Sequence, residues 1–286
     1  MTKSGTRRRG AIFAIISGLT RSKASKTGVG IIVAILVIIG VGPFLVHYAP
    51  DAISSQINSP PTYAHLFGTD YLGRDILSQI IWGAYPSMIV GIIASVGAVL
   101  IGVLVGTISG YFTKLEGPLI GAGDVILAFP PLLLLILIGS LYVVSEEIII
   151  LILILVLWPP IARATRSQVL SIRERQYVES SKTSGLGNWS IIGRIILPSV
   201  TGIAFAYFTL AVAASIVLVT ALEFLGVGNP NIVSWGSILY WAQQFAFYAG
   251  DWWWILAPGA FISLVALAFA LIGFSFEEVM NPKLRT

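Results

Sequence analysis

The chain has 286 residues, of which 56% are hydrophobic and only 10% are charged, and its mean hydropathy is +0.90. Soluble globular proteins carry about a quarter charged residues, so this composition excludes a soluble enzyme. The apolar residues are gathered in runs that lie within stretches of membrane-spanning length. The sequence therefore predicts an all-α membrane protein built as one helical bundle, because no polar stretch is long enough to form a second core.

Several motifs that would carry chemistry are absent. The chain has no cysteine, which excludes a disulfide framework, a thiolate zinc site and a cysteine nucleophile. The two histidines, His47 and His65, are too far apart for an H-E-x-x-H motif, and no lysine follows a glycine, so there is no P-loop. We therefore expect no catalytic residue, no metal and no cofactor on this chain. Any nucleotide hydrolysis has to occur on a partner.

The first 27 residues combine basic residues with a short apolar piece at 10–19. This pattern superficially resembles a signal peptide, but no cleavage site follows the apolar piece and a longer apolar run begins at Gly28. We interpret residues 1–27 as a cytoplasmic basic tail with an interfacial helix.

Residues 28–286 form the expected transmembrane domain. Its longest polar segments are residues 49–84 and the charged loop 163–198. The expected spans cover residues 28–46, 86–111, 119–144, 148–162, 199–225 and 253–274. The last two spans are separated by a loop rich in glycine, asparagine, proline and tryptophan. Six spans place both termini on the same side of the membrane.

The basic residues are distributed unequally between the two sides. Of the 17 lysines and arginines, all except Arg74 lie in the tail, in the turn after the second span, in loop 163–198 or at the end of the chain. The opposite side holds Asp51, Asp70, Asp75, Glu146, Glu147 and Asp251. By the positive-inside rule, both termini and loop 163–198 are cytoplasmic in a multi-pass plasma-membrane protein. The pI of about 9.4 thus reflects topology rather than a nucleic-acid partner.

Loop 163–198 is the longest internal charged segment. A basic helix continues from the fourth span, Gly185 and Gly187 interrupt it, and a second apolar-periodic piece ends at Pro198. Charge alone favours an ordinary solvated loop that obeys the positive-inside rule. The residue spacing favours a more specific interpretation.

The loop resembles the signature of ABC importer permeases, in which E-A-A is followed after three residues by G and after nine more by I-x-L-P. The matching residues here are Glu179, Ser180, Ser181, Gly185, Ile195, Leu197 and Pro198. The resemblance implies that residues 179–186, which end with Leu186, form a coupling helix that docks on a cytoplasmic ATPase subunit. Serines replace the family's alanines, but they are small enough for close packing. The glycine permits a backbone turn.

Further matches extend the resemblance along nearly the whole chain. Residues 65–84, HLFGTDYLGRDILSQIIWGA, resemble H-x-x-G-T-D-x-x-G-R-D-x-x-S-R in the second permease of dipeptide, oligopeptide and nickel importers. The outer-loop motif residues are Asp70, Gly73, Arg74 and Asp75. The other matching pieces are DVILAFP at 124–130, EFLGVG at 223–228, SWG at 234–236 and NPKLR at 281–285. Two positions depart from the family: Gln79, where arginine is frequent, and Val219, where an acidic residue is frequent.

This resemblance implies a type I ABC importer permease fold with six transmembrane helices and a cytoplasmic coupling helix. It also implies the following partners: a second homologous permease, two cytoplasmic ATPase subunits that bind ATP and magnesium, an extracytoplasmic solute-binding protein and the lipid bilayer. We expect a non-catalytic subunit of an importer for dipeptides or oligopeptides. Oligosaccharides stay open as a substrate, because members of the same family import them. A channel or scaffold without an ATPase is an alternative from another class, which the coupling signature disfavours.

Acidic residues within the expected spans have alternative roles. Asp124 lies about five residues into the third span, or ~8 Å deep at ~1.5 Å per residue, where it could anchor the helix or contact a substrate. Glu223 lies near the outer end of the fifth span, either on the translocation path or at an exposed rim. We expect Asp70, Arg74 and Asp75 to form an ion-pair cluster that shapes the outer loop.

Overall fold

The computed structural model describes residues 22–141, 145–229 and 231–280. These ranges are mostly helical and contain no β-strand, only an isolated bridge between Thr69 and Asp75. The elements in chain order are α2 (Lys23–Leu45), α3 (Ile76–Tyr111), η1 (Thr113–Leu115), α4 (Glu116–Leu127), α5 (Pro131–Ser140), α6 (Glu146–Arg173), α7 (Gln176–Thr183), α8 (Asn188–Ile191), η2 (Ile192–Ile196), α9 (Leu197–Phe224), α10 (Trp235–Ala249) and α11 (Trp252–Met280). The predicted all-α class is confirmed.

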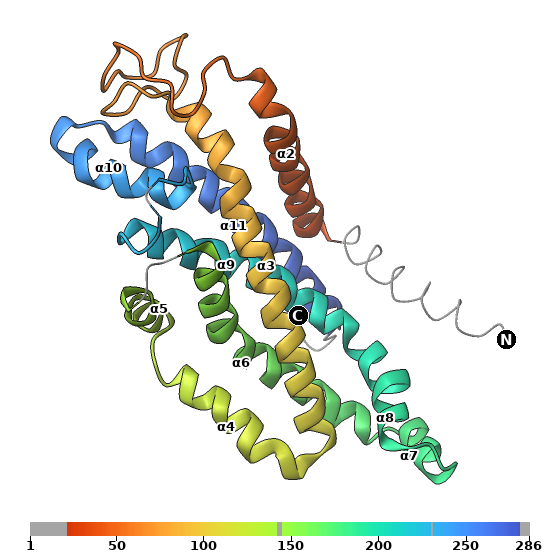
Figure 1. Ribbon diagram of the computed structural model, residues 1–286. Helices are drawn as coiled ribbons and strands as arrows, with labels where there is room; N and C mark the ends of the chain where they lie inside the picture. The colour runs from red at the N-terminus through yellow and green to blue at the C-terminus, as the bar shows by residue number, and fades with distance from the viewer. Residues whose placement is uncertain (1–21, 142–144, 230, 281–286) are drawn as a thin grey trace.

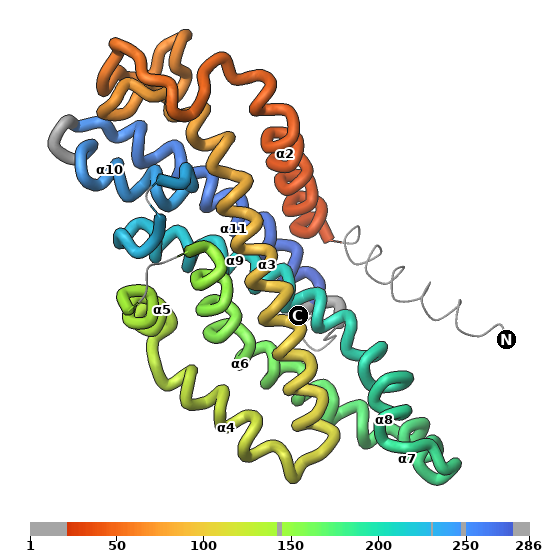
Figure 2. Tube along the Cα trace, in the orientation of Figure 1, coloured from red at the N-terminus to blue at the C-terminus, as the bar shows by residue number. Residues whose placement is uncertain are grey.

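Within the described residues, five helical stretches are long and apolar enough to cross a membrane. They are α2, α3, α6, the continuous helix Asn188–Phe224, and the Trp252–Phe276 part of α11. The sixth candidate is a broken span, in which the helices on either side of the break are bent by 83° and α5 turns away from α4 (Figure 2).

The third expected span, 119–144, is therefore not one continuous helix. Pro130 and Pro131 lie at the break, and Pro131 is the first residue of α5. Proline lacks a backbone N–H and disfavours helical geometry in the residue before it, so α4 ends before this pair. The prediction overlooked this effect. Residues 142–144, at the end of the expected span, lie outside the described residues.

Two helices begin earlier than predicted because polar side chains cap them. α2 begins before residue 28, since the Ser22 hydroxyl accepts a hydrogen bond from a backbone N–H in the first turn. α3 begins well before residue 86, since the Asp75 carboxylate caps it in the same way. The N-terminal tail up to residue 21 and the matching piece at 281–285 lie outside the described residues.

α6 passes through Pro159 and Pro160 and continues to Arg173, in agreement with the basic helix predicted beyond the fourth span. α10 differs from the prediction. α10 replaces part of the loop predicted between the last two spans. A capping box between Ser234 and Ser237 begins α10. The pair escaped notice because the common capping box has glutamate or glutamine in the second position.

α3 occupies the centre of the bundle and packs against α2, α6 and α9, while α2 also packs against α11 (Figure 1). Along the contact between α3 and α6, Gly102 faces Ile161 and Gly106 faces Ala162. A Cβ atom at either glycine would overlap its neighbour, so small residues are required for this close approach. The bundle is thus held by direct helix contacts.

Two segments outside the long helices lie at opposite ends of this bundle (Figure 1). The 46–75 segment covers one end, where the Tyr71 ring stacks on Phe245 of α10 with 4.1 Å between ring centroids. α7 and α8 lie at the other end. The predicted site residues are concentrated in these two places.

Candidate functional site

The predicted docking residues lie on α7 and in the turn that follows it. Val178 is fully buried, whereas Glu179 and Ser180 are exposed and Ser181 is half-buried. Leu186, just beyond the helix, is 37% exposed. α7 therefore attaches to the bundle through an apolar inner face and presents its predicted docking residues outward.

Gly185 ends α7 in the left-handed region of backbone conformation, with φ of +81°. Its N–H donates to the Lys182 carbonyl at 3.0 Å, and the Leu186 N–H donates to the Ser181 carbonyl at 3.1 Å. These two bonds form a Schellman motif, which satisfies carbonyl groups at the helix end. Among the described residues, no atom beyond Gly185, its two chain neighbours and the adjoining helix backbone lies within 4 Å of the position that a Cβ would take there. The constraint on this residue within the chain is therefore conformational rather than steric.

Tyr111, the last residue of α3, holds the base of α7 and α8. Its hydroxyl donates to Asn188 Oδ1 at 2.9 Å, and its carbonyl accepts a hydrogen bond from Arg173 at 3.2 Å. The Lys182 ammonium lies 5.3 Å from the centroid of the Tyr111 ring, within cation–π range. The Tyr111 ring and the Val178 side chain belong to one buried apolar cluster. The sequence does not predict this role for Tyr111, because no motif distinguishes it from other aromatic residues at a span end.

The I-x-L-P part of the motif lies where α8 passes into α9. Residues Ile192–Ile196 form a π-helix, and Leu197 begins α9. Pro198 is exposed and follows the π-helix directly, at the start of α9. Ile195 and Leu197 are partly buried against the cluster that also contains Val178. The structure thus brings both halves of the predicted motif around one apolar core.

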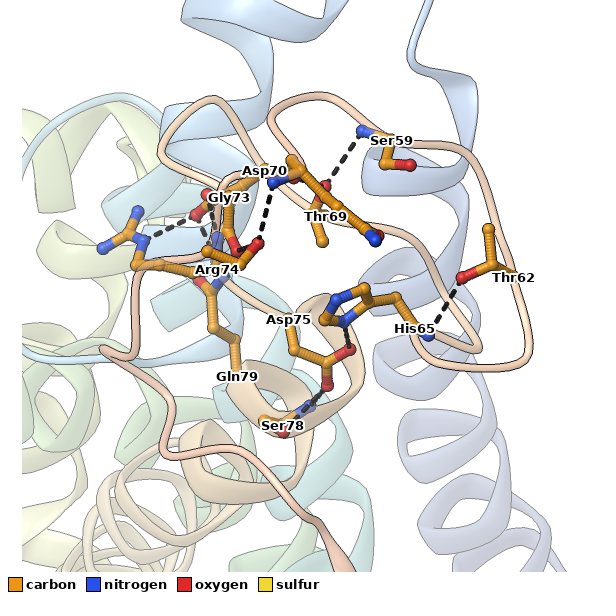
Figure 3. A network of polar contacts seen from close by, with 12 residues as sticks. Ser59, Thr62, His65, Thr69, Asp70, Gly73, Arg74, Asp75, Ser78 and Gln79 are labelled. Carbon is orange, nitrogen blue, oxygen red and sulfur yellow. Dashed lines mark hydrogen bonds and ion pairs between the residues drawn. The ribbon is translucent and has the colours of Figure 1, made fainter.

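Asp70 organises the 46–75 segment at the opposite end. It is fully buried, and its carboxylate accepts hydrogen bonds from the backbone N–H groups of Leu72 and Arg74, both at 2.9 Å (Figure 3). It also accepts from Arg74 Nε at 2.7 Å and from Gln79 Nε2 at 3.0 Å. A buried carboxylate with this many donors is fully compensated for the loss of water. Gln79, a departure from the family pattern, thus has a structural role here.

Asp75 lies in a separate cluster. Its Oδ1 is 2.9 Å from Nδ1 of His65, and its Oδ2 accepts from both the backbone N–H and the hydroxyl of Ser78 at 2.8 Å (Figure 3). Asp75 and His65 are each 4% exposed. The predicted single cluster is therefore divided into two, because Asp75 is engaged in capping α3. His65 begins the outer-loop motif in the sequence, and its contact with Asp75 was not predicted.

Two further hydrogen bonds connect the first part of the 46–75 segment to its last part. The Gly73 carbonyl accepts a hydrogen bond from the Ser54 hydroxyl at 2.7 Å, and the Thr69 hydroxyl accepts from the Ser59 N–H at 2.9 Å (Figure 3). Gly73 has φ of +79°, a backbone conformation that is unfavourable for residues with a side chain. The segment is a folded unit whose motif residues point inward and are satisfied within the chain.

Asp124 forms an ion pair that connects two helices. Arg163 of α6 donates to its Oδ1 from Nη2 at 2.6 Å and from Nε at 3.2 Å. Both side chains are 52% exposed in the isolated chain. Asp124 is thus placed to anchor α4 against α6.

Glu223 connects the end of α9 to the start of α10. Its Oε2 accepts a hydrogen bond from the Ser234 hydroxyl at 2.7 Å, and its side chain lies directly against Gly236. Ser234 is the N-cap of α10, and a carboxylate beside a helix N-terminus interacts favourably with the helix dipole. Glu223 therefore has a structural partner.

One acidic residue near the 46–75 segment lacks such a partner. Asp251, between α10 and α11, is 3% exposed, and its Oδ2 has no hydrogen-bond partner among the described residues. Burial raises the pKa of this carboxyl group, since the charged form loses its hydration. Within the described ranges, no group of three or more histidine, aspartate and glutamate side chains could hold a metal ion.

Comparison with known proteins identifies the family. Residues 98–286 match the family described as binding-protein-dependent transport system inner membrane component. The chain is 34% identical over 273 residues to the dipeptide transport system permease protein DppC of Bacillus subtilis (strain 168), covering 93% of this chain and 84% of that protein. It is 31% identical over 273 residues to the di/tripeptide transport system permease protein DppC of Pseudomonas aeruginosa (strain UCBPP-PA14), covering 91% and 89%.

A putative peptide transport system permease protein of Brucella suis biovar 1 (strain 1330) is 30% identical over 269 residues, covering 93% of this chain and 90% of that protein. The family match and these relatives agree with the bundle of membrane-length helices. They confirm the predicted resemblance over most of the chain. The chain belongs to the family of inner-membrane permease components of binding-protein-dependent transport systems.

Proposed function

We propose that this permease is one of the two transmembrane subunits of an ATP-driven importer for dipeptides or oligopeptides. The names of its relatives, which are peptide, dipeptide or di/tripeptide permeases, support this substrate class. Its partners in this proposal are a second homologous permease, two cytoplasmic ATPase subunits and an extracytoplasmic solute-binding protein. ATP and magnesium bind to the ATPase subunits, so this chain has no catalytic residue of its own.

The observation that carries the proposal is the construction of α7. Its inner face is fixed by Val178 and by the Tyr111 contacts, while Glu179, Ser180 and Leu186 are exposed. A short exposed helix on a rigid base can transmit a push or a pull to the long helices beneath it. This is the mechanical requirement for coupling to an ATPase.

The distribution of charge supports an orientation in which α7 is cytoplasmic. Arg173, Arg175 and Lys182 surround α7, whereas the 46–75 segment contains Arg74 as its only basic residue apart from histidine. Arg74 is itself paired with Asp70. The positive-inside rule then places the 46–75 segment outside and both termini in the cytoplasm.

The mechanism in this proposal is alternating access. Closure of the ATPase subunits on ATP would move α7, and the continuous helix that begins with α8 would carry this movement into α9. The solute-binding protein delivers the peptide on the outer side. Asp124 and Glu223 serve as structural anchors, as their ion pair and hydrogen bond suggest.

Reconstitution of the complete complex in lipid vesicles tests this function. The two permeases, the ATPase subunits and the solute-binding protein are combined, and ATP hydrolysis and uptake are measured with libraries of short peptides and of oligosaccharides. We expect peptides to stimulate hydrolysis and to accumulate in the vesicles. Stimulation by oligosaccharides alone would show that the substrate class is oligosaccharides and not peptides. Passage of solute without an ATPase would show that the protein is a channel and not a coupled importer.

A further inference from the structure

A groove lies beside the part of α2 that is close to the 46–75 segment. It has a volume of about 470 Å³, within the usual range for small-molecule sites, and is open on one side. Ile39 of α2 and Ile81 and Ile89 of α3 supply aliphatic walls. Trp82 and Tyr85 also line it and are 45% and 65% exposed. The groove therefore offers apolar surface together with two exposed aromatic rings.

Glu146, in the first turn of α6, is the only ionisable residue other than Tyr85 in this lining. The described residues provide no arginine, lysine or histidine that pairs with it. A positively charged group in the groove would supply the missing partner.

A second groove on α2 shows what is unusual about the first. It has a similar volume, about 500 Å³, and is lined by Asp75 among other residues. The Asp75 carboxylate, however, is already bound to His65 and Ser78. Of these two grooves, only the one at Glu146 presents a carboxylate without a partner.

We propose that the groove at Glu146 binds a membrane lipid whose headgroup carries a primary amine. α2 and α3 are membrane-length helices, and the groove lies near their ends beside the 46–75 segment, where a lipid headgroup region is expected. The acyl chain packs on the aliphatic walls, and the headgroup ammonium donates to Glu146. Trp82 and Tyr85 supply the N–H and O–H donors for the phosphate, as aromatic residues do at membrane interfaces.

Lipid binding to the purified full-length chain tests this proposal without any transport measurement, so it is independent of the proposed function. Native mass spectrometry measures the affinity for phosphatidylethanolamine and for phosphatidylcholine with the same acyl chains. The key variant is Glu146→Gln, which keeps the shape and removes the charge. Glu147→Gln is the matched control, because Glu147 shares the first turn of α6 and its dipole but does not line the groove.

The wild-type chain and Glu147→Gln should bind the primary-amine lipid about tenfold more tightly than the quaternary-amine lipid, as a charge-assisted hydrogen bond predicts. Glu146→Gln should bind both lipids with similar affinity. Equal binding of both lipids by the wild-type chain would overturn the proposal. So would an undiminished preference in Glu146→Gln, because the ammonium would then be recognised elsewhere.

Discussion

The 46–75 segment and the α7–α8 region are both polar segments that follow membrane-length helices, yet they use their polar residues in opposite ways. In the 46–75 segment, the motif residues Asp70 and Asp75 are buried and bonded within the chain. In α7, Glu179 and Ser180 are exposed, and the buried contact is apolar. A motif in the first segment therefore specifies a fold, whereas a motif in the second presents a surface.

The difference also shows in how glycine is used. Gly73 has positive φ, and a Cβ there would overlap the carbonyl of Ser54. Gly185 has positive φ as well, but the space around it is open. An internal partner fills the space at the first glycine, and on our proposal an external partner fills the space at the second.

Replacement of Asp70 by alanine should have the largest effect on stability. It leaves the Arg74 and Gln79 side chains and two backbone N–H groups without their acceptor, which should cost about 3 kcal/mol or more. Thermal unfolding and limited proteolysis within residues 46–75 measure this effect. Asp51→Ala is the control, because Asp51 is exposed in the same segment. Equal melting temperatures for the two variants would show that the buried network does not hold the segment.

Gly185→Ala should have a large effect on coupling and a small one on stability. An alanine at φ of +81° costs about 1–2 kcal/mol, which favours a different end to α7. We expect peptide-stimulated ATP hydrolysis by the complete complex to fall about fivefold or more. Gly187→Ala is the control, because Gly187 has φ of −67° and open space around it. A similar loss in both variants would argue against a specific requirement for the turn.

Tyr111→Phe sharpens the comparison by loosening the base of α7 without changing its exposed face. Loss of the hydroxyl bond to Asn188 should cost about 1 kcal/mol. A double-mutant cycle with Asn188→Ala, followed by thermal unfolding, isolates this pair. An interaction energy near zero would mean that the hydrogen bond does not stabilise the base.

Asp251→Asn should give the smallest effect, and one that depends on pH. The pKa of Asp251 is raised in the folded state, so the folded chain binds the proton more tightly than the unfolded chain does. Wild-type stability therefore falls as pH rises from below the ordinary aspartate pKa through the raised one. The variant should be slightly more stable than the wild type at neutral pH, with the difference vanishing in acid. A melting difference that is the same at every pH would exclude this explanation.

Patterns of residue type predicted the helical class, the membrane-length stretches and the family, because apolar periodicity and motif spacing are local properties. The sequence also placed Asp70 and Arg74 in one cluster. It did not predict that Asp75 would leave this cluster for His65, since capping of α3 competes for the carboxylate. Nor did it predict Tyr111, whose partners Asn188 and Arg173 are distant in the chain.

The breaks and starts of helices were harder to predict. They depend on whether a proline or capping residue outweighs the packing of the neighbouring turns. Pro130 and Pro131 end a helix, whereas Pro159 and Pro160 lie within one. In α6 the flanking turns are buried against α3, and this packing offsets the lost backbone hydrogen bonds. The sequence alone does not reveal that packing.

Site-directed labelling tests the central claim that the two segments face opposite sides and that α7 is a docking surface. The chain has no native cysteine, so single cysteines at the exposed positions Ser55 and Ser184 report unambiguously. We predict that Ser55→Cys reacts only with reagent added outside the cell. Ser184→Cys should react only from the cytoplasm, and the ATPase subunits should protect it in the assembled complex. Labelling of both positions from the same side, or unchanged labelling of Ser184→Cys in that complex, would contradict the account.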